Sequence, residues 1–371
     1  MDSISSSVIP VNRPPSPISQ HGKKEGAVAI QEKSTEQTNT GQVDPQSTIQ
    51  ESRPPIKSIE IVSQENKTKI ETWIAQLPNK DPNNIVEEIA TGNEKGPEEV
   101  SLRDTLAHLK NIGADVNKQN DEGWTPVIIA AGMGQVKFIK ALLQGLSDED
   151  RITYLNKANK YGYTPLYVAV CQKQAKVIKV LLEGLSPKDR LTYLHMAHND
   201  GDTPLYIAAQ NGHVEVITEL LKDLTTEERL TYLHMATKHG VTPLYIAAQN
   251  GHVEVITELL KGLEKDQRLT CLHKANNDGV TPLYIAAQNG HLNVIKELLK
   301  DLTTEERLTY LHMATKHGFT PILIAEKNGH LEVVQELVRA GDNLEEAKRE
   351  AKKRADHRSA MITKYFANRG N

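Results

Sequence analysis

Histidine is the residue whose side chain could bind a metal or act as an acid or base and that recurs most regularly in this sequence. Two series of four histidines each repeat every 39 residues. The first series is His195, His234, His273 and His312, and the second is His213, His252, His291 and His330. Zinc ligands must lie about 2 Å from the metal, whereas equivalent residues of stacked helices lie roughly 8–10 Å apart. We therefore expect packing or surface roles for both series, and we predict no metal site.

The two cysteines are the candidate nucleophiles. Cys171 and Cys271 lie a hundred residues apart with no partnering pattern, which suits a reducing compartment and excludes a disulfide framework. Tyrosine holds the position of Cys271 in the sister copies, at Tyr154, Tyr193, Tyr232 and Tyr310. His273 follows Cys271 by two residues, so on a helix it faces another direction. We therefore interpret Cys271 as a packing residue.

Signatures of catalysis are absent from the sequence. It contains no G-x-x-x-x-G-K-[ST], G-x-G-x-x-G, H-E-x-x-H or G-x-S-x-G motif. With 44 basic and 48 acidic residues the net charge is −4, which provides no general attraction for nucleic acid. No apolar run approaches the length that a membrane-spanning helix needs, and the N-terminus lacks the pattern of a signal peptide. We predict a cytoplasmic, monomeric protein that is not an enzyme, binds no cofactor and no nucleic acid, and has no transmembrane segment.

The residues discussed so far belong to a tandem repeat. The dipeptide Thr-Pro begins at Thr125, Thr164, Thr203, Thr242, Thr281 and Thr320, always 39 residues apart. TPLYIAAQNGHVEVITELLK is identical from Thr203 and from Thr242, and DLTTEERLTYLHMATKHG is identical from Asp223 and from Asp301. Only 4% of the residues are aromatic. Many small local cores are therefore expected in place of one large core.

Each copy contains the signals of short helices. Thr203 and Pro204 are typical of an N-cap and a first helical residue, and Gly212 ends that first helix. A second helix is expected from about Val214 to Leu224. Thr225 and Glu228 then have the spacing of a capping box, which predicts one or two further helical turns.

The run T-P-L-Y-x-A-A-x-x-G-H, followed by V-x-x-L-L, resembles the ankyrin repeat. The family pattern has T-P-L-H and a period of 33, whereas this chain has tyrosine at the fourth position and six more residues per copy. The resemblance implies an all-α fold, an ankyrin-type solenoid of stacked helix–turn–helix repeats with a short extra helical turn in each. It also implies protein binding through a concave face and the tips between repeats.

The tips are the first set of candidate contacts. Their residues alternate along the array between an Asn-Asp pair and a Lys-His pair, which could set the register of a partner's charges or could record the duplication of a two-copy block. The tip candidates are Lys160, Tyr161, Asn199, Asp200, Lys238, His239, Asn277, Asp278, Lys316 and His317.

First-helix residues are the second set of candidates. Tyr206, Tyr245 and Tyr284 form a series with Tyr167 that could be a core ladder or an exposed aromatic stripe of the kind that interfaces favour. Gln210, Gln249 and Gln288 are expected to lie exposed on the same helices.

The two ends of the chain differ from the array. Residues 1–64 are rich in Pro, Ser, Thr and Gln, so we expect a disordered tail. Residues 65–120 are expected to form a helical cap, residues 121–343 the six-unit array, and residues 344–371 a charged capping helix. That last segment has eight basic and four acidic residues from Glu345 to Arg369.

We therefore predict a scaffold that binds a partner protein. The nearly identical repeats resemble those of ankyrin proteins from intracellular bacteria, which would imply an effector translocated into a host cell. Two alternatives remain open, namely a membrane-surface adaptor that uses the basic C-terminal helix and a non-catalytic subunit of an enzyme complex.

Overall fold

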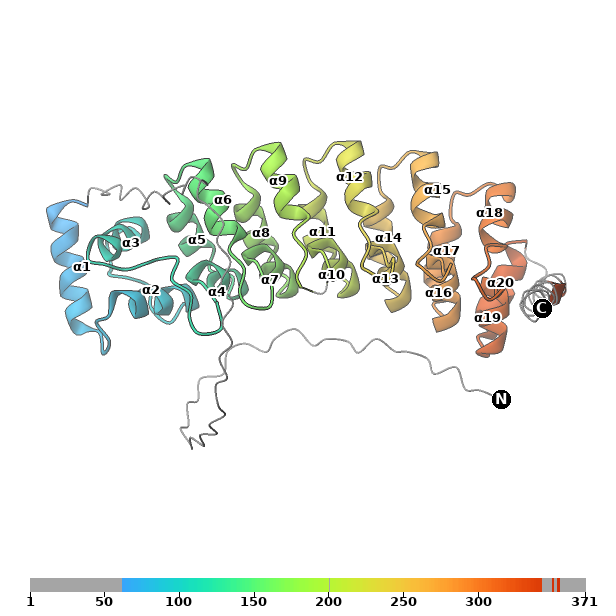
Figure 1. The fold of residues 1–371 in the computed structure, drawn as a ribbon, viewed down its shortest axis with the longest axis horizontal. Coiled ribbons are helices and arrows are strands. Elements are labelled where there is room, and N and C mark those ends of the chain that lie inside the picture. Colours follow the sequence, from blue (N-terminus) through green and yellow to red (C-terminus); the bar gives the residue numbers. More distant parts are fainter. Residues whose placement is uncertain (1–61, 200, 342–348, 350–351, 354–371) are drawn as a thin grey trace, which may run out of the picture. The chain divides into compact units, whose positions relative to one another are not determined.

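The computed structural model describes residues 62–199, 201–341, 349 and 352–353 of the chain, and within them it contains twenty helices and no strand. The helices follow one another in a single row of stacked units (Figure 1). The all-α solenoid expected from the repeat is therefore confirmed. Residues 62–64 apart, the predicted disordered tail lies outside the described residues, and so does the tip residue Asp200.

Three helices precede the first Thr-Pro copy. They are α1 (Gln64–Gln76), α2 (Pro82–Thr91) and α3 (Leu102–Asn111). Asp81 caps α2 through its carboxylate, and Gly92 ends that helix with a left-handed φ of 85°. Helix α2 packs on the first helix of the next unit and α3 packs on its second helix. These two helices therefore stack like a further repeat, although they lack the Thr-Pro signal.

The first helix of each copy begins at its Thr-Pro. These helices are α4 (Pro126–Gly132), α7 (Pro165–Cys171), α10 (Pro204–Gln210), α13 (Pro243–Asn250), α16 (Pro282–Asn289) and α19 (Pro321–Lys327). In the first five, the threonine hydroxyl accepts the backbone N–H three residues later at 3.2–3.3 Å. Thr320 makes no such bond with any described residue. The expected N-caps are thus present in all copies except the last.

The second helices carry the main apolar stripe. They are α5 (Val136–Leu143), α8 (Ala175–Leu182), α11 (Val214–Leu221), α14 (Val253–Leu260), α17 (Leu292–Leu299) and α20 (Leu331–Arg339). In α11, Val216, Ile217 and Leu220 are completely buried. This helix ends at Leu221, three residues before the expected end, because the chain leaves the helical region at Lys222 and reaches φ +59° at Asp223.

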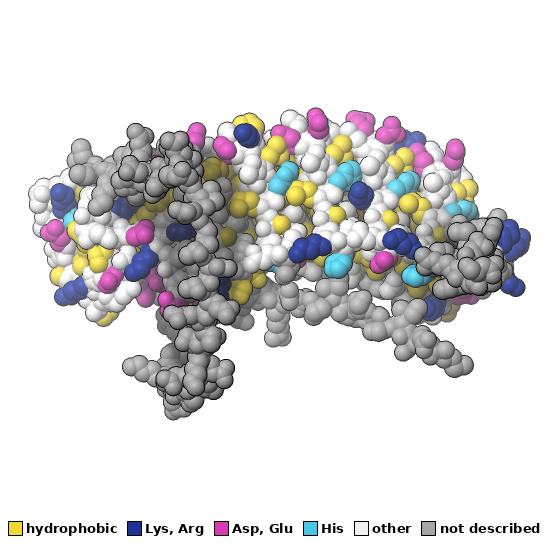
Figure 2. Space-filling view, in the orientation of Figure 1, with side chains coloured by type: hydrophobic (Ala, Val, Ile, Leu, Met, Phe, Trp, Pro, Cys, Tyr) yellow, Lys and Arg dark blue, Asp and Glu magenta, His cyan; other side chains and the backbone are white. Residues whose placement is uncertain are grey.

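The six inserted residues help to form a complete third helix in each of five units. These helices are α6 (Asp148–Asn156), α9 (Pro187–Leu194), α12 (Thr226–Leu233), α15 (Lys265–His273) and α18 (Thr304–Leu311). They are as long as the second helices, with eight or nine residues each, which is about two turns and matches the upper end of the one or two turns expected. Their first turns carry acidic residues, such as Glu227 in α12 and Glu305 in α18. Figure 2 shows acidic side chains gathered along one edge of the array. Carboxylates in the first turn of a helix stabilise its dipole.

Each kind of helix stacks on its own kind. First helices pack on first helices and second helices on second helices throughout the array. Their buried residues form one continuous apolar core from Ile85 to Leu337. Small residues such as Ala208 and Ala209, both fully buried, allow the first helices to lie close together.

Polar contacts hold neighbouring units in register. The backbone carbonyl of Gln210 accepts the Nε2–H of His252 at 2.9 Å and the amide N–H of Asn250 at 2.8 Å. The two following units repeat this pair of bonds at the carbonyls of Gln249 and Gln288. Gly212, with φ +73°, suits this close approach, because a Cβ would lie 3.0 Å from the His252 ring.

The third helix supplies a hydroxyl to the first helix of its own unit. The Tyr193 hydroxyl is fully buried and accepts the backbone N–H of Leu166 at 3.0 Å. The Tyr310 hydroxyl does the same for Leu283 at 3.1 Å. These N–H groups belong to the first turn of a helix, where no intrahelical acceptor exists. Tyr193 and Tyr310 are therefore core residues that also cap a first helix, and Tyr232 is a core residue at the same position.

In four of the five units that have a third helix, this helix also reaches the following unit through an arginine at the same position, whereas Arg307 donates to the Leu302 carbonyl of its own unit. Arg229 donates from Nη2 to the carbonyls of Glu258 and Leu259, at 2.9 and 3.4 Å, at the C-terminal end of α14. Arg151, Arg190 and Arg268 make the corresponding bonds to the end of the next second helix. A cation at this end of a helix satisfies free carbonyls and complements the dipole.

Replacing one of these arginines should weaken the array. We expect Arg229→Ala to lower the free energy of unfolding by about 1.5–3 kcal/mol, because charge-assisted hydrogen bonds to buried carbonyls are lost. Arg229→Lys should recover only part of this, since one ammonium group cannot match the forked guanidinium. Urea unfolding of the full chain measures both.

The matched control is Arg339→Ala, whose side chain is exposed and contacts only Glu336 at 3.6 Å among the described carboxylates. Such a surface pair is worth about 0–1 kcal/mol. Equal losses for Arg229→Ala and Arg339→Ala would contradict the role assigned to the arginine series.

Candidate functional site

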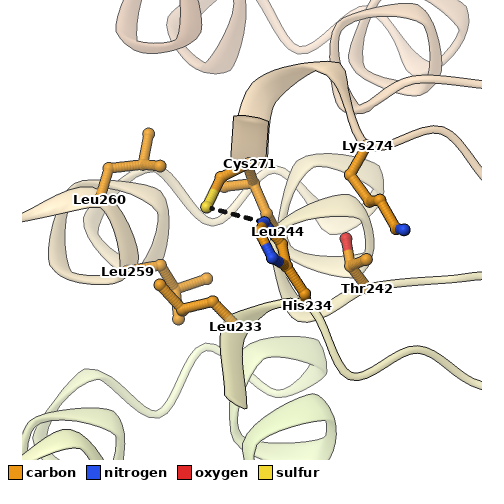
Figure 3. A pocket seen from close by; sticks show the side chains of 8 residues that line it. All are labelled: Leu233, His234, Thr242, Leu244, Leu259, Leu260, Cys271 and Lys274. Atoms are coloured by element: carbon orange, nitrogen blue, oxygen red, sulfur yellow. Dashed lines mark hydrogen bonds between the residues drawn. The ribbon is translucent and has the colours of Figure 1, made fainter. Parts of the chain in front are cut away.

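The first place where the structure could support chemistry is the pair formed by the buried Cys271 and the half-buried His234. The Cys271 Sγ lies 3.5 Å from the His234 Nε2, which comes from the preceding unit (Figure 3). The sequence suggests only His273 as a neighbour of this thiol, because His234 lies 37 residues away along the chain. The pair lines a narrow pocket, too tight for a water molecule, beside Leu233, Leu244, Leu259 and Leu260.

The electrostatics of this pair oppose a catalytic role. Burial raises the pKa of the Cys271 thiol to about 11, and burial lowers the pKa of His234. Both groups are therefore neutral near pH 7. Reactive cysteines have lowered pKa values and are partly exposed, whereas Cys271 is buried and Cys171 has a pKa raised by burial to about 12. Neither thiol has the environment of a nucleophile.

Three members of the first histidine series, His195, His234 and His273, contact the third helix of the following unit, whereas His312 is exposed. The His195 ring meets the Tyr232 ring of the next unit at 5.2 Å, and the His273 ring meets Tyr310 at 5.1 Å. Burial lowers the pKa of His195, His234 and His273. The neutral imidazole is thus the form that the folded array holds at these positions.

Within the described part of the chain, no three His, Cys, Asp or Glu side chains gather closely enough to hold a metal ion. None of the helices in that part is long and apolar enough to cross a membrane.

The tips are the second place to consider. Consecutive tips are joined through their backbones: Asn277 N–H donates to the His239 carbonyl and Lys316 N–H to the Asp278 carbonyl, both at 3.0 Å. Each tip also turns on a glycine of positive φ, such as Gly240 at +77°. Backbone hydrogen bonds thus join the tips at residues 122, 160 and 199 to one another, and those at residues 238, 277 and 316 to one another, so these tips are not separate loops.

The predicted tip residues divide into two groups by what their side chains do. The amides of Asn199 and Asn277 donate to the carbonyls of Lys160 and Lys238 in the preceding tip, at 3.2 and 3.0 Å. Asparagine at these tips therefore links neighbouring tips. The second group has exposed side chains: Lys160, Tyr161, Lys238, His239, Asp278, Lys316 and His317.

Tyr161 belongs to a cluster of rings that the sequence pattern does not reveal. We call Trp124, Tyr161, Tyr163, Tyr167 and His198 the aromatic cluster. Tyr163 is at its centre, stacked on Tyr167 with centroids 5.0 Å apart, with Tyr161 at 5.8 Å and Trp124 at 6.4 Å. The cluster continues to His198, whose ring lies 5.0 Å from that of Tyr167.

The outer edge of the aromatic cluster is accessible. Tyr161 is 47% exposed, and Trp124 and Tyr163 are half-buried. Glu122 holds Tyr161 in place, since its carboxylate accepts the Tyr161 hydroxyl at 3.1 Å and pairs with Lys160. In the sequence, the only sign of this cluster is that an aromatic residue directly precedes each of the first two Thr-Pro dipeptides. The contacts between rings of different copies arise only when the copies stack.

Tyr206, Tyr245 and Tyr284 lie in the core. Each is only 6–7% exposed, and burial raises the pKa of Tyr206 and Tyr284 to about 12. The structure thus decides the question that the sequence left open, in favour of a core ladder and against an exposed aromatic stripe. Gln210, Gln249 and Gln288 are half-buried, and their carbonyls serve the contacts between units.

The repeated part of the chain matches a known protein family. A model of ankyrin repeats, in three copies, matches residues 99–191, 188–269 and 244–347. The matched span covers more than half of the chain. No curated protein gives a significant match.

The buried histidines predict a stability that depends on pH. Because burial depresses the folded-state pKa of His195, His234 and His273, the unfolded chain binds more protons below its own histidine pKa of about 6.5. Their contribution is therefore complete above pH 6.5 and is lost as the pH falls toward 5. Urea midpoints measured from pH 7.5 to 5 should decrease, and the variant with all three replaced by Gln should show a smaller decrease. Equal slopes in the two proteins would refute this assignment.

The narrow pocket at Cys271 predicts that a larger side chain there is destabilising. Cys271→Tyr brings the hydroxyl that Tyr193 and Tyr310 provide in sister units, but the pocket is too tight for a water molecule, so the ring must displace the surrounding leucines. We expect it to lower the free energy of unfolding by about 1–3 kcal/mol, and Tyr310→Cys to lower it by about 2–4 kcal/mol. Urea unfolding tests both, and a gain of stability in Cys271→Tyr would mean that the leucines move apart at little cost.

Proposed function

The chain belongs to the ankyrin-repeat family, and we propose that it binds a partner protein along its row of tips, with the aromatic cluster as the anchor of the interface. Ankyrin repeats are generally modules for protein–protein interaction. The observation that carries the proposal is the exposed Tyr161 in a cluster of rings, next to tips whose charged side chains are exposed.

The order of the tips favours binding. Backbone bonds between consecutive tips and the amides of Asn199 and Asn277 hold the row before a partner arrives. Each flexible side chain that is immobilised at an interface costs about 0.5–1.5 kcal/mol of binding free energy, and the ordering of loops adds to this cost. A row that is already ordered avoids much of that cost.

The aromatic cluster has the composition of an energetic centre. Trp and Tyr are enriched at interface hot spots, since they bring a large rigid area and a polar atom together. Trp124, Tyr161 and Tyr163 come from two neighbouring tips. Their mutual ring contacts fix their orientation without a partner.

Charged tips beyond the cluster support recognition of one partner over others. Lys238 and Lys316 are exposed two units apart, and Asp278 is exposed on the tip between them. A partner whose charges match this alternation meets attraction at each tip, and one displaced by a single unit meets repulsion. The alternation therefore supports specificity and register, while the rings support affinity.

Two variants of the full chain test the proposal. One combines Lys238→Glu and Lys316→Glu, and the other is Tyr161→Ala. Proteins retained from a eukaryotic cell lysate by the immobilised chain are identified by mass spectrometry, and the affinity of each retained protein is then measured. We expect a selected partner to bind the charge variant and Tyr161→Ala at least about tenfold more weakly, the usual effect of removing a hot spot.

The matched control is Lys137→Glu with Lys176→Glu. Both lysines lie near the beginning of second helices, so this control changes the net charge by the same amount away from the tips. A partner that binds the wild type and the control equally, but not the tip variants, supports the proposal. Retained proteins that bind all variants equally would exclude the tips as the binding site.

A further inference from the structure

The last unit of the array exposes apolar residues that the inner units cover wholly or in part. Helix α20 has no following second helix among the described residues, and its Leu331 and Val338 are 70% and 47% exposed. The counterparts of Val338 in the inner units are Leu221, Leu260 and Leu299, and these are only 3–5% exposed. The difference arises because the next unit covers each of them.

The residue of α20 between Leu331 and Val338 on this face is also more exposed than its counterparts in the inner units. Val334 of α20 is partly exposed, whereas its counterparts Ile217, Ile256 and Ile295 are completely buried. Together, Leu331, Val334 and Val338 form what we call the end face. Its apolar residues repeat the side of a second helix that packs against a neighbour, so the end face is suited to cover by another helix.

The segment that follows α20 has a matching apolar stripe. Residues 342–371 continue directly from the last described unit. Their apolar residues recur at helical spacing, in steps of three, four or seven along the chain. The members of this stripe are Leu344, Ala347, Ala351, Ala355, Ile362 and Phe366.

Three residues of this segment are described by the structure, and their exposure agrees with an apolar stripe on the other side of a helix. Arg349, Lys352 and Lys353 are helical and exposed. On a helix, residues at i, i+3 and i+4 share one face, and this basic face lies opposite the apolar stripe. The exposed basic face therefore leaves the stripe available to turn toward the protein.

Charge favours the same pairing. From Glu345 to Arg369 the segment has eight basic and four acidic residues. Helix α20 carries Glu332, which is exposed, and Glu336. Attraction between a basic helix and these carboxylates would add to apolar contact, whereas a second copy would bring α20 acidic residues against one another.

We propose that residues 344–366 form a helix that covers the end face and closes the array. The covalent connection gives the segment an effective concentration in the millimolar range, well above that of a second copy in solution. The segment would thereby replace the missing neighbour of α20 and prevent the end face from associating with other chains.

Hydrogen exchange of the full chain, followed by mass spectrometry, tests this proposal. We compare wild type with Leu331→Glu, which places a charge in the end face at a residue too exposed to be needed for folding α20. The control Met133→Glu changes an exposed apolar side chain on an inner unit. We expect exchange protection of the 344–366 amides in the wild type and in Met133→Glu, and a loss of about tenfold or more in Leu331→Glu.

A reciprocal pair of variants in the segment makes the test specific. Ile362→Glu, in the stripe, should increase exchange in α20, whereas Lys364→Glu should leave it unchanged. Protection of 344–366 that does not respond to Leu331→Glu would overturn the proposal, because the helix would then lie elsewhere. Absence of protection in the wild type would also overturn it, and light scattering would then distinguish an end face covered by a second copy from one left open in a monomer.

Discussion

Backbone groups at helix ends are the constraint on which this structure depends. A helix leaves its first four N–H groups and its last four carbonyls without intrahelical partners. In helices as short as these, that is about half of all backbone groups. An array of such helices therefore needs partners for its helix ends from elsewhere. The threonine N-caps, the buried tyrosine hydroxyls, the histidine and asparagine donors and the arginine series all supply them.

The third helix provides hydrogen-bond partners for helix ends in two consecutive units. Its tyrosine serves the first helix of the same unit, and its arginine serves the second helix of the following unit. One inserted element thus contributes to two helix ends in two units. Because each unit contacts only its neighbours, stability depends on these local links. The same links hold the tips in a fixed row, which is the physical basis for the binding surface proposed above.

Much of the fold could be predicted from single residues. Thr203-Pro204 and the pair Thr225 and Glu228 specify helix starts through local hydrogen bonds, and all of these form as expected. The end of the second helix was less predictable, because Lys222 and Asp223 carry no strong stop signal. The Arg229 series was visible as a regular recurrence from copy to copy, but nothing local indicates that its partners are carbonyls of the following unit.

The sequence alone determined the repeat, its helix starts and the family, because these depend on local hydrogen bonding and on periodicity. It did not determine which side chains of a repeated series are exposed. Tyr161 and Tyr206 are chemically the same, yet one is at a tip and the other lies between stacked helices. Only the tertiary structure decided this, because burial depends on the neighbouring unit. The same reason explains why Val338 is exposed while Leu299, its counterpart in the preceding unit, is buried.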